Sequence, residues 1–142
     1  KKTAPGSCLL NTASAAGIYG TSGASVYSAT KFGVRAITES LDAEWAEYGI
    51  NVRSIMPSFI DTPLINHNPN DRSNASIREQ VLSSGLEITP VSEVGEAAWQ
   101  AVHGDKLHTT VGKTAKRVAF AARWMPGKMR KEARKRAALG VD

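Results

Sequence analysis

The sequence contains almost no cysteine, few aromatic residues and no long apolar run. Cys8 is the single cysteine among 142 residues, so no disulfide can form within the chain, which fits a reducing compartment. No run of eighteen apolar residues occurs, so the sequence predicts no membrane-spanning helix. A charged and apolar leader is also absent at the start. We therefore expect a soluble protein of the cytoplasm.

A metal-binding pattern is missing as well. His67, His103 and His108 show no metal-ligand spacing with one another or with Cys8, so we predict no metal site. The apolar content of 42% is sufficient for a folded core and differs from that of a disordered segment.

The charge is distributed unevenly along the chain. Residues 1–112 carry 8 basic and 11 acidic side chains, a net charge of −3. Residues 113–142 carry 10 basic and 2 acidic side chains, a net charge of +8, and together these give the overall +5. We therefore separate a main part, 1–112, from a basic helical tail, 113–142.

The first half of the chain shows a strand, helix, strand pattern. Residues 6–12 predict a buried strand, residues 25–48 a long helix that stops at Gly49, and residues 50–56 a second strand that ends at Pro57. Such a βαβ unit requires parallel strands and a right-handed crossover, and it predicts an α/β fold with part of a doubly wound, Rossmann-like sheet. The expected apolar stripe of the helix consists of Val34, Ile37, Leu41 and Trp45.

The pattern after Pro57 is more irregular. The expected elements are a mobile substrate lid at 64–74, helices at 76–84 and 89–102, a strand at 107–111, and tail helices at 114–125 and 128–139. Thr89 is expected to cap the second of these helices, with Pro90 in its first turn. Pro126 and Gly127 are expected to separate the two tail helices.

Three side chains near the first strand and helix point to proton-transfer chemistry. Tyr27 and Lys31 are four residues apart, which on an α-helix places both side chains on one face. A cation beside a phenol favours the phenolate and lowers the tyrosine pKa from its usual value of about 10, so that it can exchange a proton with an alcohol. Ser14 follows the first strand, at the sheet edge where open α/β folds bind ligands. Asn11 is expected to hold loop backbone.

This pattern resembles the short-chain dehydrogenase/reductase family. The resemblance rests on the Ser14, Tyr27 and Lys31 spacing, on the strand ending NTAS, and on the motifs YSATK and GINV before Pro57. It implies hydride transfer between a nicotinamide cofactor and a carbonyl compound or secondary alcohol. In these terms Tyr27 is the general acid or base, Lys31 lowers its pKa and holds the nicotinamide ribose, and Ser14 polarises the substrate oxygen.

The resemblance also implies a cofactor site after the second strand. In the family this strand is followed by Pro-Gly, a short spacer and a threonine, which hydrogen-bond the nicotinamide carboxamide. Pro57, Ile60 and Thr62 match this arrangement, whereas Ser58 replaces the glycine and brings a Cβ atom close to the cofactor. The implied cofactor is NAD or NADP, and the sequence leaves the choice between them open.

The family's glycine-rich phosphate loop does not occur in the sequence. We therefore interpret residues 1–112 as the carboxyl-terminal half of a Rossmann-like catalytic domain. Besides a small-molecule substrate, the resemblance implies a homodimer or homotetramer that associates partly through the helix at 25–48.

Two alternatives remain for the function: a non-catalytic fragment or interaction module with the same fold, and a related epimerase or dehydratase. For the tail we favour a solvated surface helix. A subunit contact or lid comes second, and attachment to a membrane surface or nucleic acid third. We expect no nucleic-acid partner for the protein as a whole.

Overall fold

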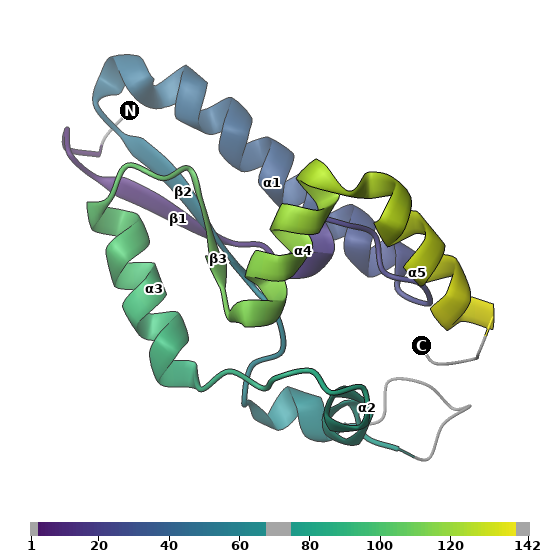
Figure 1. The fold of residues 1–142 in the computed structure, drawn as a ribbon. Helices are drawn as coiled ribbons and strands as arrows, with labels where there is room; N and C mark the ends of the chain where they lie inside the picture. Colours follow the sequence, from purple (N-terminus) through teal and green to yellow (C-terminus); the bar gives the residue numbers. More distant parts are fainter. Residues whose placement is uncertain (1–2, 68–74, 139–142) are drawn as a thin grey trace.

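A three-stranded parallel sheet with the order β1-β2-β3 forms the centre of the protein. The computed structural model describes residues 3–67 and 75–138 (Figure 1). The strands are β1 (Cys8–Thr12), β2 (Asn51–Pro57) and β3 (His108–Val111). Both neighbouring pairs are parallel. The predicted α/β class is confirmed.

The central strand, β2, forms the core of the sheet. All its residues after Asn51 are buried, because β2 has a strand on each side and helices over both faces. Ile55 packs with Ala101 and Val111, and this cluster is extended by the partly buried Leu10, Val94, Ala97 and Ala98.

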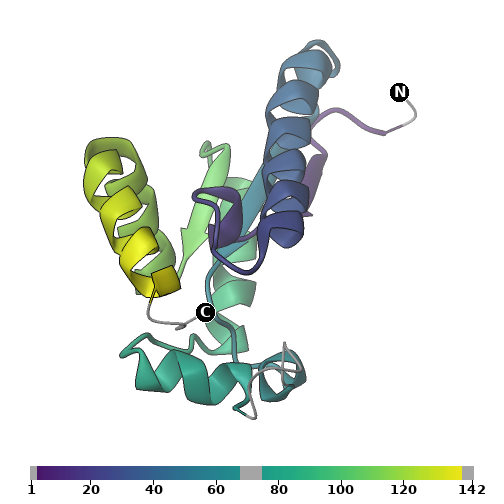
Figure 2. The same cartoon turned by 90° about the vertical axis from the view of Figure 1, so that its right-hand side faces the viewer.

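Helices cover the two faces of the sheet (Figures 1 and 2). The α-helices are α1 (Ser25–Trp45), α2 (Ile77–Ser83), α3 (Val91–His103), α4 (Lys113–Trp124) and α5 (Pro126–Ala138). The described residues also form the short 3₁₀ helices η1 (Ala15–Gly17), η2 (Ala46–Tyr48) and η3 (Pro63–Asn66). Helix α1 contacts the face that carries Asn11, whereas α3 packs on the face that carries Leu10 and Ile55. The result is a three-layer α/β/α arrangement.

The two crossover connections have opposite hands. The strands follow one another across the sheet in chain order, yet α1 and α3 lie on opposite faces. Figures 1 and 2 show the β1-α1-β2 crossover to be right-handed, as predicted, so the β2-α3-β3 crossover is left-handed. The second connection passes η3 and α2 across the carboxyl end of the sheet before α3 returns along the other face.

The predicted buried stripe of α1 is wrong at one position. Ile37 is 56% exposed, and the neighbouring Thr38 is fully buried. Thr38 takes this place because its hydroxyl accepts a hydrogen bond from Asn11 Nδ2 (3.0 Å) and donates to the carbonyl of Val34 (2.8 Å). Asn11 therefore joins β1 to α1 by a hydrogen bond between two side chains. The expected contact of Asn11 with loop backbone is not the one that the structure shows.

Two predicted helix boundaries differ from the structure. Pro90 rather than Thr89 is the N-cap of α3, and the Thr89 hydroxyl has no hydrogen-bond partner within the described residues. Helix α4 already ends at Trp124. Pro126 is the first residue of α5 and does not lie between the two tail helices, because a proline suits the first turn of a helix. In the expected lid, Pro63–Asn66 forms η3, whereas residues 68–74 lie outside the described part.

Within the described residues, none of the helices combines the length and apolar character needed to cross a bilayer.

Candidate active site

Ser14 lies between the carboxyl ends of β1 and β2. It is the N-cap of η1, and its Oγ accepts a hydrogen bond from the backbone N–H of Ala16 (3.2 Å). The same hydroxyl donates a long hydrogen bond to the carbonyl of Pro57 (3.5 Å), the last residue of β2. The side chain is almost completely buried, so its position is fixed by both strand ends.

Tyr27 and Lys31 lie on one face in the first turns of α1, as their spacing predicts. The Lys31 Nζ is 5.6 Å from the centroid of the Tyr27 ring and donates a hydrogen bond to the carbonyl of Thr12 (3.2 Å). The Tyr27 side chain is about half exposed. The ammonium therefore lies between the phenol and the end of β1, two residues before Ser14.

The loop after β1 packs tightly on the start of α1. A Cβ atom on Gly17 would lie 2.7 Å from the backbone oxygen of Lys31, a distance that real Cβ contacts do not show. Farther along the loop, the N–H of Thr21 donates to the Ser28 hydroxyl (3.1 Å), which is buried in α1. The small residues of this loop therefore set the distance between Ser14 and the helix that carries Tyr27.

The segment after β2 contains the four residues of the expected cofactor site. Pro57 ends β2, and the N–H of Ser58 donates to the carbonyl of Val111 (3.3 Å). Ile60 forms an isolated parallel bridge with Thr89, and Thr62 is the N-cap of η3, with its hydroxyl near the carbonyl of Ile60 (3.4 Å). All four lie on the chain that leaves the same sheet edge as Ser14.

Ser58 is directed into the protein, toward Gly112. Its hydroxyl is buried and has no hydrogen-bond partner within the described residues. A Cβ atom on Gly112 would lie 2.9 Å from Ser58 Oγ, 2.6 Å from Thr89 Oγ1 and 3.0 Å from Glu87 Oε1. Gly112 also has a φ of +87°, which favours glycine. Glu87 accepts hydrogen bonds from the N–H groups of Lys113 and Thr114, so it caps the start of α4.

Sequence reasoning missed this junction between β3 and α4. The available signal was a glycine directly between an expected strand and an expected helix, which often marks a backbone turn. The partner carboxylate, Glu87, is separated from it by 25 residues and could not be identified from local spacing.

A serine, a histidine and a glutamate form a hydrogen-bonded chain in the middle of the sheet. Ser54 Oγ lies 2.7 Å from His108 Nδ1, and His108 Nε2 lies 3.0 Å from Glu39 Oε1. The hydrogen bonds from His108 and from Arg35 lower the pKa of Glu39. Ser54 is completely buried in β2, so its hydroxyl cannot reach a substrate as a nucleophile would. This chain joins α1, β2 and β3.

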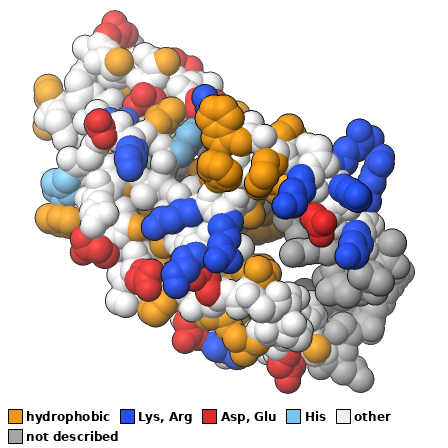
Figure 3. All heavy atoms as spheres, viewed as in Figure 1, with side chains coloured by type: hydrophobic (Ala, Val, Ile, Leu, Met, Phe, Trp, Pro, Cys, Tyr) orange, Lys and Arg blue, Asp and Glu red, His pale blue; other side chains and the backbone are white. Residues whose placement is uncertain are grey.

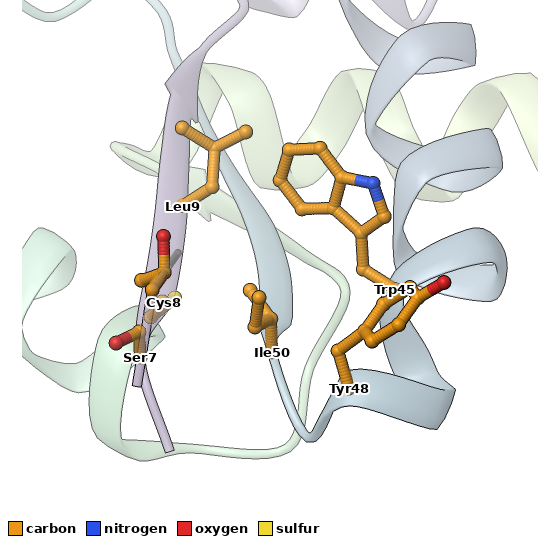
Figure 4. A pocket seen from close by; sticks show the side chains of 7 residues that line it. Ser7, Cys8, Leu9, Trp45, Tyr48 and Ile50 are labelled. Atoms are coloured by element: carbon orange, nitrogen blue, oxygen red, sulfur yellow. The ribbon is translucent and has the colours of Figure 1, made fainter. Parts of the chain in front are cut away.

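A hollow lies at the opposite end of the sheet (Figure 4). It is an open cavity of about 530 Å³ at the amino ends of β1 and β2, where Trp45 and Tyr48 face Leu9 and Ile50. Its remaining lining residues are Thr3, Ser7 and Cys8. Burial raises the pKa of the Cys8 thiol. In the described part of the chain, no group of three His, Cys, Asp or Glu residues could hold a metal ion.

Comparison with known proteins identifies the family. The model of the family described as short chain dehydrogenase matches residues 2–73, about half of the chain and its amino-terminal part, which contains Ser14, Tyr27 and Lys31. The chain belongs to this family of oxidoreductases.

Two curated relatives match less than half of the chain. Cyclohexanol dehydrogenase from an Acinetobacter strain is 44% identical over 62 residues, which is 44% of this chain and 25% of the relative. An uncharacterised short-chain type dehydrogenase/reductase from Sinorhizobium fredii is 41% identical over 61 residues, 43% of this chain and 11% of that protein. The matched part thus spans a quarter or less of these relatives.

Solved structures show the same fold over more of the chain. A short chain dehydrogenase from Burkholderia cenocepacia, in complex with NADP, superimposes with a TM-score of 0.72 at 20% identity, covering 89% of this chain and 46% of that one. Levodione reductase superimposes with a TM-score of 0.61 at 22% identity, covering 78% and 46%. The chain therefore spans just under half of these structures.

Proposed function

We propose that this chain carries the proton-transfer end of an NAD(P)-dependent oxidoreductase that interconverts a carbonyl compound and a secondary alcohol. The observation that carries the proposal is the position of the Lys31 ammonium, between the Tyr27 ring and the carboxyl end of β1 beside Ser14. The interpretation of residues 1–112 as the carboxyl-terminal half of a larger catalytic domain remains part of this proposal.

Each of the three side chains has a role that its surroundings support. The half-exposed Tyr27 exchanges the hydroxyl proton with the substrate oxygen. Lys31 stabilises the negative charge that forms on the phenolate oxygen. Ser14, held in place by the ends of two strands, donates a hydrogen bond to the substrate oxygen. Gly17 keeps these groups together because the loop can approach α1 closely.

The residues after β2 fit a nicotinamide cofactor. The N–H of Thr89 donates a hydrogen bond to the carbonyl of Phe59 (2.8 Å), and the carbonyl of Thr89 accepts one from the N–H of Asp61 (2.9 Å). In an extended segment the backbone groups alternate in direction, so the N–H and carbonyl of Ile60 face away from Thr89 and can pair with a carboxamide. Ser58 is no obstacle there, since its hydroxyl is buried against Gly112.

The same proposal assigns further roles on the cofactor side. Thr62 adds a hydroxyl to the carboxamide site, and Lys31 is the group that would hold the ribose. The bound cofactor supplies the hydride chemistry, and the protein supplies position and charge. The structures similar to this chain include one solved with NADP, which supports NADP as the first cofactor to test.

Exposed apolar side chains along α1 support the proposed homo-oligomer. Val26 and Ile37 are 78% and 56% exposed and, being eleven residues or about three turns apart, lie along one face of this helix. Large apolar side chains that gather on one element are more typical of a subunit contact than of a solvated surface.

Substitution of Tyr27 by Phe in the full-length protein tests the proposal. Turnover should fall by at least about a hundredfold, the usual size of a general acid or base contribution, because the ring remains and only the exchangeable proton is lost. Cyclohexanol with either NAD or NADP is a suitable first assay, because one relative is a cyclohexanol dehydrogenase. Formation of reduced nicotinamide is the measured quantity.

Tyr48→Phe is the matched control, because this tyrosine lies at the amino end of the sheet and should leave turnover unchanged. Isothermal titration with NAD and NADP should give the same heat for the wild type and for Tyr27→Phe. Normal turnover of Tyr27→Phe would remove the role assigned to this residue. Absence of heat with both cofactors would favour the non-catalytic alternative.

A further inference from the structure

Helix α4 presents aromatic side chains among basic ones on its exposed face. Phe120 and Trp124 are 59% and 65% exposed. At 3.6 residues per turn they lie within about 40° of each other around the helix, in line with Lys113. The other exposed residues of α4, Lys116, Arg117 and Arg123, flank this line on both sides. The opposite face of the helix packs on the protein through the fully buried Ala115.

The exposed face of α4 carries only cations besides its aromatic residues. The sequence of α4 contains no Asp or Glu. The guanidinium of Arg123 lies over the Trp124 ring, with Cζ 5.3 Å from its centroid. Burial of two large rings in an apolar phase is favourable, whereas their exposure to water, as here, is costly. Within the described residues none of the α4 cations forms an ion pair, and such a cationic and aromatic face suits a partner that offers both apolar and anionic groups.

Helix α5 extends the basic surface beside α4. The two helices contact each other, and α5 adds five exposed cations against a single acidic residue, Glu132. These exposed cations are Lys128, Arg130, Lys131, Arg134 and Lys135. In Figure 3, apolar side chains lie over α4, with Lys and Arg side chains on both sides along α4 and α5.

Helix α3 shows that an exposed tryptophan alone is not distinctive. Trp99 is also 65% exposed, on a helix of similar length. However, α3 contains no Lys or Arg, its charged residues are Glu93 and Glu96, and Trp99 stacks on His103 with ring centroids 4.1 Å apart. Helix α3 therefore lacks the cations that surround the exposed rings of α4.

We propose that α4 and α5 together form a docking surface for the anionic surface of a phospholipid bilayer. Phe120 and Trp124 enter the interfacial layer of the bilayer, where aromatic side chains are favoured. The surrounding Lys and Arg side chains extend to the lipid phosphates and headgroups. The aromatic residues lie on a convex helix, which suits a bilayer better than the grooves with which proteins hold single-stranded nucleic acid.

Co-sedimentation of the full chain with lipid vesicles tests this proposal. One set contains phosphatidylcholine alone, and the other contains about one third phosphatidylserine. Both are used at low ionic strength and at about 0.15 M salt, because screening weakens purely electrostatic binding. We expect binding to the anionic vesicles under both conditions and at least about tenfold weaker binding to neutral vesicles.

Two variants separate the aromatic and the basic contributions. The double variant Phe120→Ser/Trp124→Ser should lose at least about tenfold in binding, because both buried rings are removed. The triple variant Lys128→Glu/Lys131→Glu/Lys135→Glu should lose a similar amount through repulsion from anionic lipid. All these positions are exposed, so the fold should persist, which circular dichroism would verify. Trp99→Ser is the matched control and should bind as the wild type does.

Several results would overturn the proposal. One is failure of the wild type to bind anionic vesicles at low ionic strength, and another is an equal loss of binding in Trp99→Ser. If Phe120→Ser/Trp124→Ser binds anionic vesicles as tightly as the wild type, the binding is purely electrostatic and the aromatic residues have no part in it. Tighter binding to a single-stranded RNA than to vesicles would assign the face to nucleic acid. A change from dimer to monomer in the double variant, measured by light scattering, would assign it to a subunit contact.

Discussion

The two ends of the parallel sheet differ in what they offer a ligand. The carboxyl end brings together Ser14, Tyr27 and Lys31 beside Pro57. The amino end has the cavity of about 530 Å³, lined mainly by apolar side chains such as Trp45. The amino end therefore offers a hollow with few polar groups, whereas the carboxyl end offers the polar groups to which we assign the proposed chemistry.

The difference has a simple physical origin. At the carboxyl end, small residues such as Gly17 let the loop backbone touch α1, so polar groups converge and leave little empty space. At the amino end, the bulky side chains of Trp45 and Tyr48 separate the end of α1 from β1. Because β1 is an edge strand of the described sheet, the volume of this cavity depends on what covers that edge.

The largest expected difference between the two ends is in turnover after loss of a serine hydroxyl. Ser14→Ala should lower turnover by about a hundredfold, because a positioned donor to a developing charge contributes about this much. Ser7→Ala, which changes the lining of the amino-end cavity, should leave turnover unchanged. The rate of nicotinamide reduction at saturating substrate measures both. Equal effects of the two substitutions would break the assignment of chemistry to the carboxyl end.

A smaller effect is expected on stability, from two glycines of the same loop. Gly17→Ala should lower the free energy of unfolding by about 1–3 kcal/mol, because its Cβ would collide with the backbone oxygen of Lys31. Gly20→Ala should raise or lower it by less than about 1 kcal/mol, since nothing lies within 4 Å of the added atom. Urea unfolding of the two variants gives both values. If Gly17→Ala proves as stable as the wild type, the loop is less tightly held than the geometry indicates.

The main elements of the fold could be predicted from the sequence because their signals are local. The apolar runs before Thr12 and Pro57 identify two strands, and Gly49, with a φ of +65°, ends the helical segment between them. The spacing of Tyr27 and Lys31 correctly placed both on one face, because helix periodicity depends on nothing outside the helix.

Apart from the helix boundaries at Pro90 and Pro126, the differences concern side chains whose position depends on distant partners. Thr38 replaces Ile37 as the buried residue because Asn11, 27 positions earlier, supplies a hydrogen bond. The junction at Gly112 depends on Glu87 in the same way. No periodic pattern in the sequence contains such pairings, and the assignment of roles to Ser14, Tyr27 and Lys31 stays a prediction until turnover is measured.

The smallest expected effect concerns Glu39, which lies between the two ends and joins α1 to β3. Hydrogen bonds from His108 and Arg35 hold the pKa of Glu39 below its usual value of 4.5 in the folded protein. A carboxyl group whose pKa is lowered by folding stabilises the fold above its unfolded pKa, and this contribution disappears as the pH falls through the lower, folded pKa. The side chain is 45% exposed, so solvent screening limits the contribution to less than about 1 kcal/mol.

Glu39→Gln should therefore be slightly less stable than the wild type at neutral pH, and this difference should shrink as the pH falls below 4.5. Urea unfolding at several pH values measures the difference. Glu44→Gln, a change at an exposed position of the same helix, should alter the free energy of unfolding by less than about 0.5 kcal/mol throughout. A deficit in Glu39→Gln that stays constant down to pH values well below 4.5 would mean that the hydrogen bonds to His108 and Arg35 do not depend on the carboxylate charge. The link between α1 and β3 would then rest on hydrogen bonds and packing that protonation of Glu39 leaves intact.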